Sequence, residues 1–312
     1  MRIVIALGGN AILRRGQPLE EYIQHQNVRA AARTLTEIIQ EHEVIVTHGS
    51  GPQIGLLALQ AAAYTEVHPY PLDVLGAEAE GMIGYRIEQE LRNHLQAPRQ
   101  VVTLLTQIEV DPNDPALEVP SKPIGPLYSE EEAARLTRKY GWVMAPEQGK
   151  MRRVVPSPSP LRILEMQAIR LLVDAGITVI CAGSGGIPVV RQTDGYYGGV
   201  EVVIDKDRAS ALLAEQAQAD VLLLLTDVDA LYEGWGTPHA RAIQRVSPEW
   251  LQARSFASGS MGPKVEAACA FVRHTNGRAV IGSLEQAPAL LRGECGTTIT
   301  NTALEVTYHP HP

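Results

Sequence analysis

The chain has 312 residues, of which 45% are hydrophobic and 20% charged, and its formal net charge at pH 7 is -8. This composition is typical of a globular protein with one large domain or two lobes. The acidic balance argues against a broad surface for nucleic acid or membranes, where positive charge dominates, so any anion site must be local.

Short continuous apolar runs predict strands that are buried on both faces. These runs cover residues 3–7, 44–46, 101–105, 177–181, 200–204, 221–225 and 279–281. Helix-like stretches lie between them, at 19–41, 53–64, 73–95, 160–175, 207–218 and 263–275. The alternation predicts an α/β fold with an open, mainly parallel sheet sandwiched between helices, and ligands outside the carboxyl ends of the strands.

Glycine-rich turns follow three of these strands, at residues 7–10, 48–52 and 182–188. We expect most of them to open a helix. Glycine lets an anion approach the backbone, and a helix N-terminus adds unpaired N–H groups and a positive dipole end. One such turn would be ordinary punctuation, but several together predict a phosphate-handling site.

Residues 111–153 interrupt the strand–helix alternation. Their first part, residues 111–126, has too many prolines for a central strand or helix, and an acidic helix start follows at Ser129. Long excursions of this kind are functional lids or flexible insertions. We favour a protruding lid, because Lys122 lies in a stiffened segment, and we expect the turn at 156–160 to lead back into a helix.

Phosphoryl transfer requires reactants held in line and positive groups around the transferred oxygens. Lys206 and Lys264 lie at a predicted strand end and helix start, where they can supply that charge. Two interpretations of Asp207 stay open: it caps the helix, or it orients both lysines without acting as a general base. His48 is assigned a structural role, because a lone histidine without a visible partner is more often a hydrogen-bonding group.

A polar turn, Thr226-Asp227-Val228-Asp229, follows the most apolar strand, with Tyr232 close behind. It is either simple turn chemistry or a site for adenine or ribose. The chain lacks the P-loop pattern, which lowers the expectation of a common ATPase class. The three cysteines are far apart without metal-ligand spacing, and we predict no protein-held metal site. No apolar run approaches the roughly 20 residues of a membrane span, so we expect a cytoplasmic protein without membrane or nucleic-acid partners.

Eight motifs together match one family, and the match runs nearly end to end. They lie at residues 6–11, 48–53, 122–126, 153–158, 185–189, 204–207, 225–229 and 259–267. On these motifs the chain resembles the carbamate kinases, members of the amino-acid-kinase superfamily. The resemblance implies reversible transfer between ATP and carbamate to give ADP and carbamoyl phosphate, with Mg²⁺, without a covalent intermediate, and usually run toward ATP. It also implies a homodimer of open α/β sandwiches.

The resemblance also implies roles for individual residues. Lys206, Lys264, Asp207, Asn10 and Gly8 would be catalytic, and Gly9, Gly49, Ser50, Gly51 and Lys122 would bind substrate. The nucleotide would contact Asp205, Thr226, Asp227, Val228, Tyr232, Met261, Gly262 and Lys264. Residues 1–199, with the lid at 111–153, would form the carbamate and phosphoryl lobe of a single domain, and residues 200–312 the nucleotide lobe.

Two positions depart from the family pattern. Its second turn usually reads His-Gly-Asn-Gly, where this chain has Ser50, and Ser184 interrupts a usual run of glycines. Serine offers one hydroxyl in place of an amide, so Ser50 changes the expected grip on a small planar substrate. These departures bear on substrate affinity more than on reaction class. Beside the carbamate kinase hypothesis, two alternatives stay open: a kinase for another small carboxylate such as an N-acyl amino acid, and a non-catalytic nucleotide sensor.

Overall fold

The computed structural model describes residues 1–14, 16–256 and 261–310. Within these ranges the centre of the molecule is a ten-stranded sheet in which six neighbouring strands, from β15 to β3, run parallel. Across the sheet the strands are β13 (Leu231–Glu233), β14 (Arg241–Val246), β16 (Thr297–Ile299), β15 (Arg278–Ser283), β12 (Val221–Thr226), β1 (Arg2–Leu7), β2 (Glu43–His48), β9 (Ile177–Ile180) and β3 (Gln100–Thr103), with β17 (Thr307–Tyr308) paired to β14. The predicted mainly parallel α/β sheet is confirmed.

Both faces of this sheet are covered, as continuous apolar strands require. Along β1, Ile3 and Ile5 belong to one core, and Val4 and Ala6 belong to the other. The first core contains α1 (Glu21–Glu41), α3 (Leu72–His94) and α9 (Ala287–Arg292), and the second contains α5 (Met166–Asp174), α6 (Lys206–Gln216) and α8 (Met261–His274). Two further helices are α2 (Gly51–Ala63) and α7 (Pro248–Gln252).

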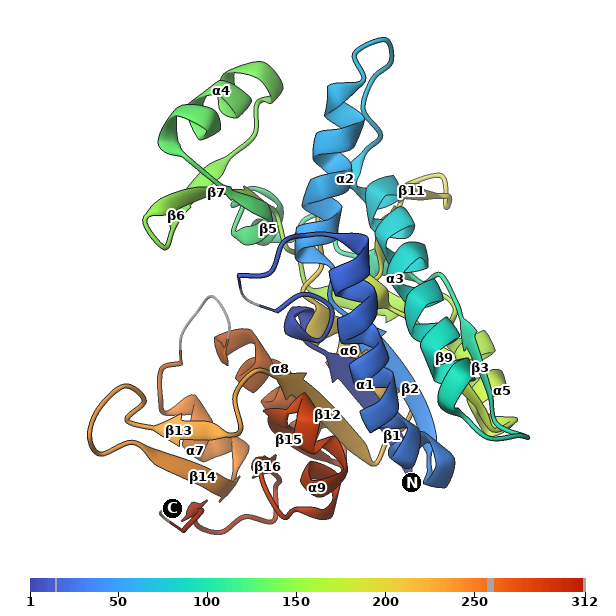
Figure 1. Cartoon of the computed structure of the whole chain (residues 1–312), viewed down its shortest axis with the longest axis vertical. Helices are drawn as coiled ribbons and strands as arrows, with labels where there is room; N and C mark the ends of the chain where they lie inside the picture. Colours follow the sequence, from blue (N-terminus) through green and yellow to red (C-terminus); the bar gives the residue numbers. More distant parts are fainter. Residues whose placement is uncertain (15, 257–260, 311–312) are drawn as a thin grey trace.

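The proline-rich excursion forms a small sheet of its own, projecting from the main body (Figure 1). It contains β5 (Lys122–Tyr128), β6 (Met144–Glu147) and β7 (Lys150–Val155), with α4 (Glu130–Tyr140) between β5 and β6. Ser129 caps α4 by accepting the Glu132 N–H at 3.2 Å, as its acidic start predicts. Glycines bring the base of this lid against α2, since a Cβ on Gly55 would lie 1.9 Å from the Gly125 Cα.

A second small sheet lies beside the main one. Its strands are β11 (Tyr197–Gly199), β10 (Ile187–Arg191), β4 (Gln107–Val110) and β8 (Pro160–Ile163). Its last strand corrects the predicted helix at 160–175: the turn at 156–160 leads into β8, and α5 begins only at Met166. Pro160 makes a poor helix interior but a tolerable strand start.

The predicted strand at 200–204 is also wrong. Val202, Val203 and Ile204 are buried, but their backbone joins no sheet, and the Val203 N–H donates instead to the Pro156 carbonyl at 3.1 Å. The apolar run records burial rather than strand pairing, and it carries the chain through the core to the start of α6.

The expectation that most glycine turns open a helix is wrong as well. Only the turn at 48–52 opens an α-helix, α2; the turns at 7–10 and 182–188 form single 3-10 turns, Gly9–Ala11 and Gly183–Gly185. Of the last sequence motif, Gly259 and Ser260 lie outside the described residues.

Candidate active site

The glycine turns after β1 and β2 meet at the carboxyl edge of the sheet. The Gly49 N–H donates to the Leu7 carbonyl at 3.2 Å, and the Gly8 N–H donates to the Leu225 carbonyl at 3.1 Å. A Cβ on Gly8 would lie 2.7 Å from that carbonyl oxygen, so this position has no space for a larger residue. A Cβ on Gly49 would lie 3.5 Å from the Gly9 nitrogen, which places the two turns side by side.

Two lysines and one aspartate form a cluster beside these turns. Lys206 Nζ lies 2.5 Å from Asp207 Oδ1, and Lys264 Nζ lies 3.2 Å from Asp207 Oδ2. All three side chains are largely buried, and a Cβ on Gly49 would lie 3.3 Å from the Lys206 Cδ. The arrangement places both ammonium groups on one carboxylate at the edge of the glycine cradle.

Asp207 does not cap α6. Asp205 does so, since its Oδ1 accepts the Asp207 N–H at 2.9 Å and the Arg208 N–H at 3.3 Å. The capping interpretation of Asp207 is therefore wrong, and its carboxylate is left for the lysines. Burial raises the pKa of Asp207, but the charges of Lys206 and Lys264 outweigh it and hold that pKa below its usual value.

Lys122 reaches the same cluster from the lid. Its ammonium group forms an ion pair with Asp205 Oδ2, the oxygen that the helix cap does not use. The lid base also touches the second glycine turn, because a Cβ on Gly51 would lie 3.8 Å from the Pro123 carbonyl oxygen. Three lysines from three separate segments thus meet two aspartates at the start of α6.

The predicted nucleotide residues occupy two neighbouring places. Met261 and Gly262 begin α8, one turn before Lys264, while Thr226 ends β12 and Asp227 and Val228 follow it. A cavity of about 280 Å³ joins this second group to the first glycine turn, since Gly8, Asn10, Thr226 and Asp227 are among its lining residues. Tyr232 lies on β13, where its hydroxyl donates to Asp229 at 2.9 Å and its ring packs on Trp235.

Ser50 occupies the N-cap position of α2, but its side chain does not cap the helix. Its hydroxyl is hydrogen-bonded instead to the Ser184 hydroxyl, from the turn after β9, and both residues are buried. The two departures from the family pattern are therefore in direct contact. Sequence reasoning left Ser184 out of the site, because nothing in one sequence pairs residues 134 positions apart.

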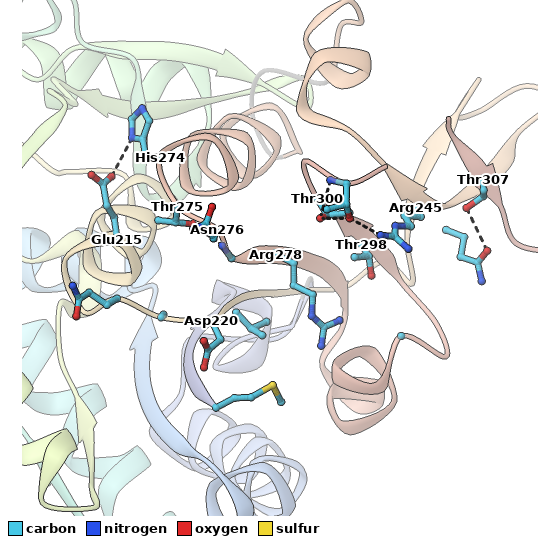
Figure 2. Close-up of a pocket in the computed structure, with 18 residues that line it drawn as sticks. Glu215, Asp220, Arg245, His274, Thr275, Asn276, Arg278, Thr298, Thr300 and Thr307 are labelled. Carbon is cyan, nitrogen blue, oxygen red and sulfur yellow. Dashed lines mark hydrogen bonds and ion pairs between the residues drawn. The ribbon is translucent and has the colours of Figure 1, made fainter. Parts of the chain in front are cut away.

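A larger hollow lies at the opposite ends of the strands (Figure 2). It measures about 1070 Å³, and Asp220, Arg245, Arg278 and Thr298 are among the residues that line it. None of the predicted site residues does so. The size of the hollow alone would place the active site at this end of the sheet. The buried lysines and aspartates place it at the other end.

No helix in the described part of the chain is both long and apolar enough to cross a membrane. In the same part, no three His, Cys, Asp or Glu side chains are grouped so that they could hold a metal ion.

Comparisons with known proteins find relatives that match nearly the whole chain. The model of the amino acid kinase family matches residues 1–283. The carbamate kinase of Rhizobium meliloti (strain 1021) is 51% identical over 311 residues, which cover 99% of this chain and 96% of that protein. The carbamate kinase of Haemophilus influenzae (strain ATCC 51907 / DSM 11121 / KW20 / Rd) is 52% identical over 309 residues, 99% of this chain and 100% of the relative.

Among solved structures, carbamate kinase from Giardia lamblia bound to AMP-PNP superposes with a TM-score of 0.87. It is 39% identical, and the match covers 96% of this chain and 98% of the other. That relative binds an ATP analogue on the fold found here.

Proposed function

This chain belongs to the amino acid kinase family, and from that membership we propose that it transfers a phosphoryl group reversibly between ATP and carbamate, forming ADP and carbamoyl phosphate. Relatives that are 51% and 52% identical over nearly the whole chain are carbamate kinases, which supports this substrate pair. Within the site, the observation that carries the proposal is the convergence of Lys206 and Lys264 on Asp207 beside the glycine turns.

Each part of the site has a role in an in-line transfer without a covalent intermediate. Lys206 and Lys264 stabilise the negative charge that develops on the transferred phosphoryl group and the leaving phosphate oxygens. Asp207 holds both ammonium groups in place and takes no proton from substrate. The first turn, Gly8, Gly9 and Asn10, cradles the phosphoryl group, and the second, Gly49, Ser50 and Gly51, faces carbamate.

We assign the nucleotide to the end of β12 (Thr226, Asp227, Val228) and the start of α8 (Met261, Gly262, Lys264), with further contacts to Asp205 at the start of α6 and to Tyr232 on β13. Asp205 and Asp207 are already engaged by lysines. Mg²⁺ therefore fits best as an ion carried by the nucleotide phosphates, whose charge it neutralises when bound. A cytoplasmic location, with access to ATP and ADP, belongs to the same proposal.

The test is to mix the protein with ADP, Mg²⁺ and carbamoyl phosphate and to follow ATP. We expect ATP well above the uncatalysed background. Parallel reactions of ATP with acetylglutamate, aspartate, acetate or UMP test other acceptors. Turnover of acetylglutamate without formation of ATP from carbamoyl phosphate would favour an N-acyl amino acid kinase, and nucleotide binding without any turnover would favour a sensor.

Lys122→Ala should chiefly impair the use of carbamoyl phosphate. Because a hydrogen bond to a charged group contributes about 1.5–3 kcal/mol, the KM for carbamoyl phosphate should rise roughly 10- to 100-fold. The KM for ADP should change much less. Steady-state kinetics check this, with Lys150→Ala as a control in the same lid, since Lys150 is exposed on β7. Equal kinetics in the two variants would make the lid merely structural.

We further propose a homodimer formed through the outer face of α3, which lies at the edge of the molecule in Figure 1. Val74, Met82 and Tyr85 form an exposed apolar stripe on this helix, 37%, 44% and 54% accessible. Leu105 extends the stripe beyond β3, the edge strand of the main sheet, and its side chain lies beside Gly81 of α3. An exposed apolar face next to a sheet edge is the kind of surface that a second copy covers.

The double change Met82→Glu with Tyr85→Glu should convert the dimer to a monomer, because it would bury four unpaired charges in the twofold interface. Light scattering after gel filtration measures the mass. Leu304→Glu is the matched control, since Leu304 is 99% accessible and distant in the chain. A wild-type protein of monomer mass would contradict the proposal, as would an unchanged dimer of the double variant.

A further inference from the structure

A buried carboxylate lies beneath the third glycine turn and belongs to none of the roles assigned above. Glu80, on α3, is 1% accessible. Its Oε1 accepts the Gly183 N–H at 2.9 Å, and its Oε2 accepts the Thr106 N–H at 3.3 Å. Within the described ranges no lysine or arginine forms an ion pair with it. A buried carboxylate without a cation is costly, so its position requires an explanation.

The turn that Glu80 holds has a strained backbone. Ala182 and Ser184 both have positive φ, 50° and 64°, a region that disfavours side chains other than glycine. Conformations of this kind are energetically unfavourable and persist only where the surroundings impose them. The surroundings here are Glu80, on the Gly183 N–H, and the Thr106 hydroxyl, which accepts the Ala182 N–H at 2.9 Å.

On its other side, Gly183 packs against the ring of His48. A Cβ on Gly183 would lie 2.2 Å from the His48 Nε2 and 3.0 Å from the Glu80 Cγ, so Gly183 fits between the two side chains only because it has no Cβ. Burial lowers the pKa of His48 to about 4, so the ring is neutral at pH 7 and supplies no charge to Glu80. Gly183 and its turn are therefore held between the side chains of Glu80 and His48.

The clamped turn carries Ser184, whose hydroxyl is bonded to that of Ser50. When two hydroxyls share one hydrogen bond, one O–H stays free to donate, and oxygen lone pairs stay free to accept. A planar carbamoyl group offers the complementary set, a carbonyl oxygen that accepts and an amide N–H that donates. The serine pair can therefore replace a single amide side chain as a recognition element.

We infer that Ser184 and Ser50 together form the subsite for the carbamoyl group, and that Glu80 is the positioning residue that sets Ser184 through the Gly183 N–H. The inference rests on the proposed function and deepens it, because it assigns the acceptor side of the site to a second turn. Glu80 touches no substrate and acts only through the turn.

Protonation gives this arrangement a pH dependence. Burial raises the pKa of Glu80 to about 8, against the opposing effect of the Thr106 and Gly183 hydrogen bonds. The groups that face it or act on its neighbours are His48, Glu165, Cys181 and, through His48, Lys206. Of these, the Glu165 charge further raises the pKa of Glu80. When Glu80 ionises, its carboxylate becomes a buried anion without a cation. Either water must enter to solvate it, or the turn at Gly183 must shift.

The raised pKa of Glu80 also determines how the stability of the protein changes with pH. The pKa of about 8 in the folded state lies above the ordinary value of 4.5, so the folded protein holds one more proton than the unfolded chain between those two values. Stability contributed by neutral Glu80 is fully present below about pH 4.5 and is lost as the pH rises through about 8.

The experiment measures kcat and the KM for carbamoyl phosphate, at saturating MgADP, from pH 6.5 to 9.5. In the wild type this KM should rise roughly tenfold above pH 8, whereas Glu80→Gln, which cannot ionise, should show the same KM at every pH in that range. Glu90→Gln is the matched control, because Glu90 is a buried carboxylate on the same helix, bonded to His25 at 2.7 Å and assigned no role in the site. It should follow the wild type. A rise in KM that is the same in Glu80→Gln as in the wild type would overturn the role of Glu80.

Ser184→Ala tests the subsite independently of Glu80. Its KM for carbamoyl phosphate should rise roughly tenfold while its KM for ADP is unchanged, and equal KM values in Ser184→Ala and the wild type would overturn the subsite. Urea unfolding between pH 6 and 9 provides a readout that needs no turnover. The wild type should lose stability with rising pH more steeply than Glu80→Gln. If the wild type forms no ATP but this difference appears, the proposed function fails while the titration of Glu80 stands; if ATP forms but the difference is missing, only the role of Glu80 fails.

Discussion

Lys206→Met should lower the kcat for ATP formation by on the order of 10²-fold or more, with little change in the KM for either substrate. The ammonium group lies 2.5 Å from Asp207, beside both glycine turns, where it can meet the charge that develops in the transition state. Removing one preorganised donor from such a place typically costs about 3 kcal/mol of transition-state stabilisation. Methionine keeps the aliphatic stem that packs against Gly49, so the loss reports charge rather than packing.

Lys264→Met should give a loss of the same order, because its ammonium group holds the other oxygen of Asp207. Lys139→Met is a suitable control, since Lys139 lies in the last turn of α4 and packs over the Tyr140 ring. Circular dichroism and thermal unfolding show whether each variant folds. Near-normal turnover in a folded Lys206 or Lys264 variant would remove that lysine from the proposed mechanism.

Asp207→Asn should lower both turnover and stability. The change leaves two largely buried ammonium groups facing each other without their carboxylate. Breaking a buried ion pair by removing one partner costs about 3–5 kcal/mol in the free energy of unfolding. Turnover should fall by on the order of 10²-fold, because both lysines lose the group that fixes them.

The acid dependence of stability separates this role from a general packing defect. The pKa of Asp207 in the folded state lies below its ordinary value, so the stability that it contributes is present above about pH 4 and is lost as the pH falls through the folded-state pKa. The free energy of unfolding, measured in urea, should therefore fall more steeply from pH 7 to pH 3 in the wild type than in Asp207→Asn. Asp194→Asn, in an exposed turn, should behave like the wild type. Equal slopes for Asp207→Asn and the wild type would contradict the predicted ion-pair role.

The sequence predicted most of the central sheet because its strands are covered on both faces. Runs such as Val221 to Leu225 are apolar throughout, as expected for a strand that is buried on both faces. The run at 200–204 is also mostly apolar, and Val202, Val203 and Ile204 are buried, but the Val203 N–H pairs with Pro156, a distant segment that forms no strand with it. Local hydrophobicity reports burial, whereas pairing depends on the rest of the fold.

The charged cluster could be predicted in part. Lys206 and Asp207 are neighbours in the chain, and a carboxylate between lysines was one of the two interpretations of Asp207. Which aspartate caps α6 depends on the backbone of one turn, and composition does not distinguish Asp205 from Asp207. Glu80 did leave a signal, since it occupies an apolar position in the helical period of α3, between Leu75 and Ile83. Its partner, Gly183, lies 103 residues away and is visible only in three dimensions.

The parallel pairing of β1 with β12 affects how substrates can enter and leave the site. The five parallel pairs from Ile3 and Val221 to Leu7 and Leu225 join the two predicted lobes into one sheet. Pulling those lobes apart would break a buried ladder along its whole length, so a clamshell hinge between them is mechanically unfavourable. The lid is anchored differently, by its packing on α2 and by the Lys122 ion pair. We therefore expect gating to reside in the lid, with the rate of product release sensitive to solvent viscosity and to the Lys122–Asp205 contact, while the floor of the site stays fixed throughout the cycle.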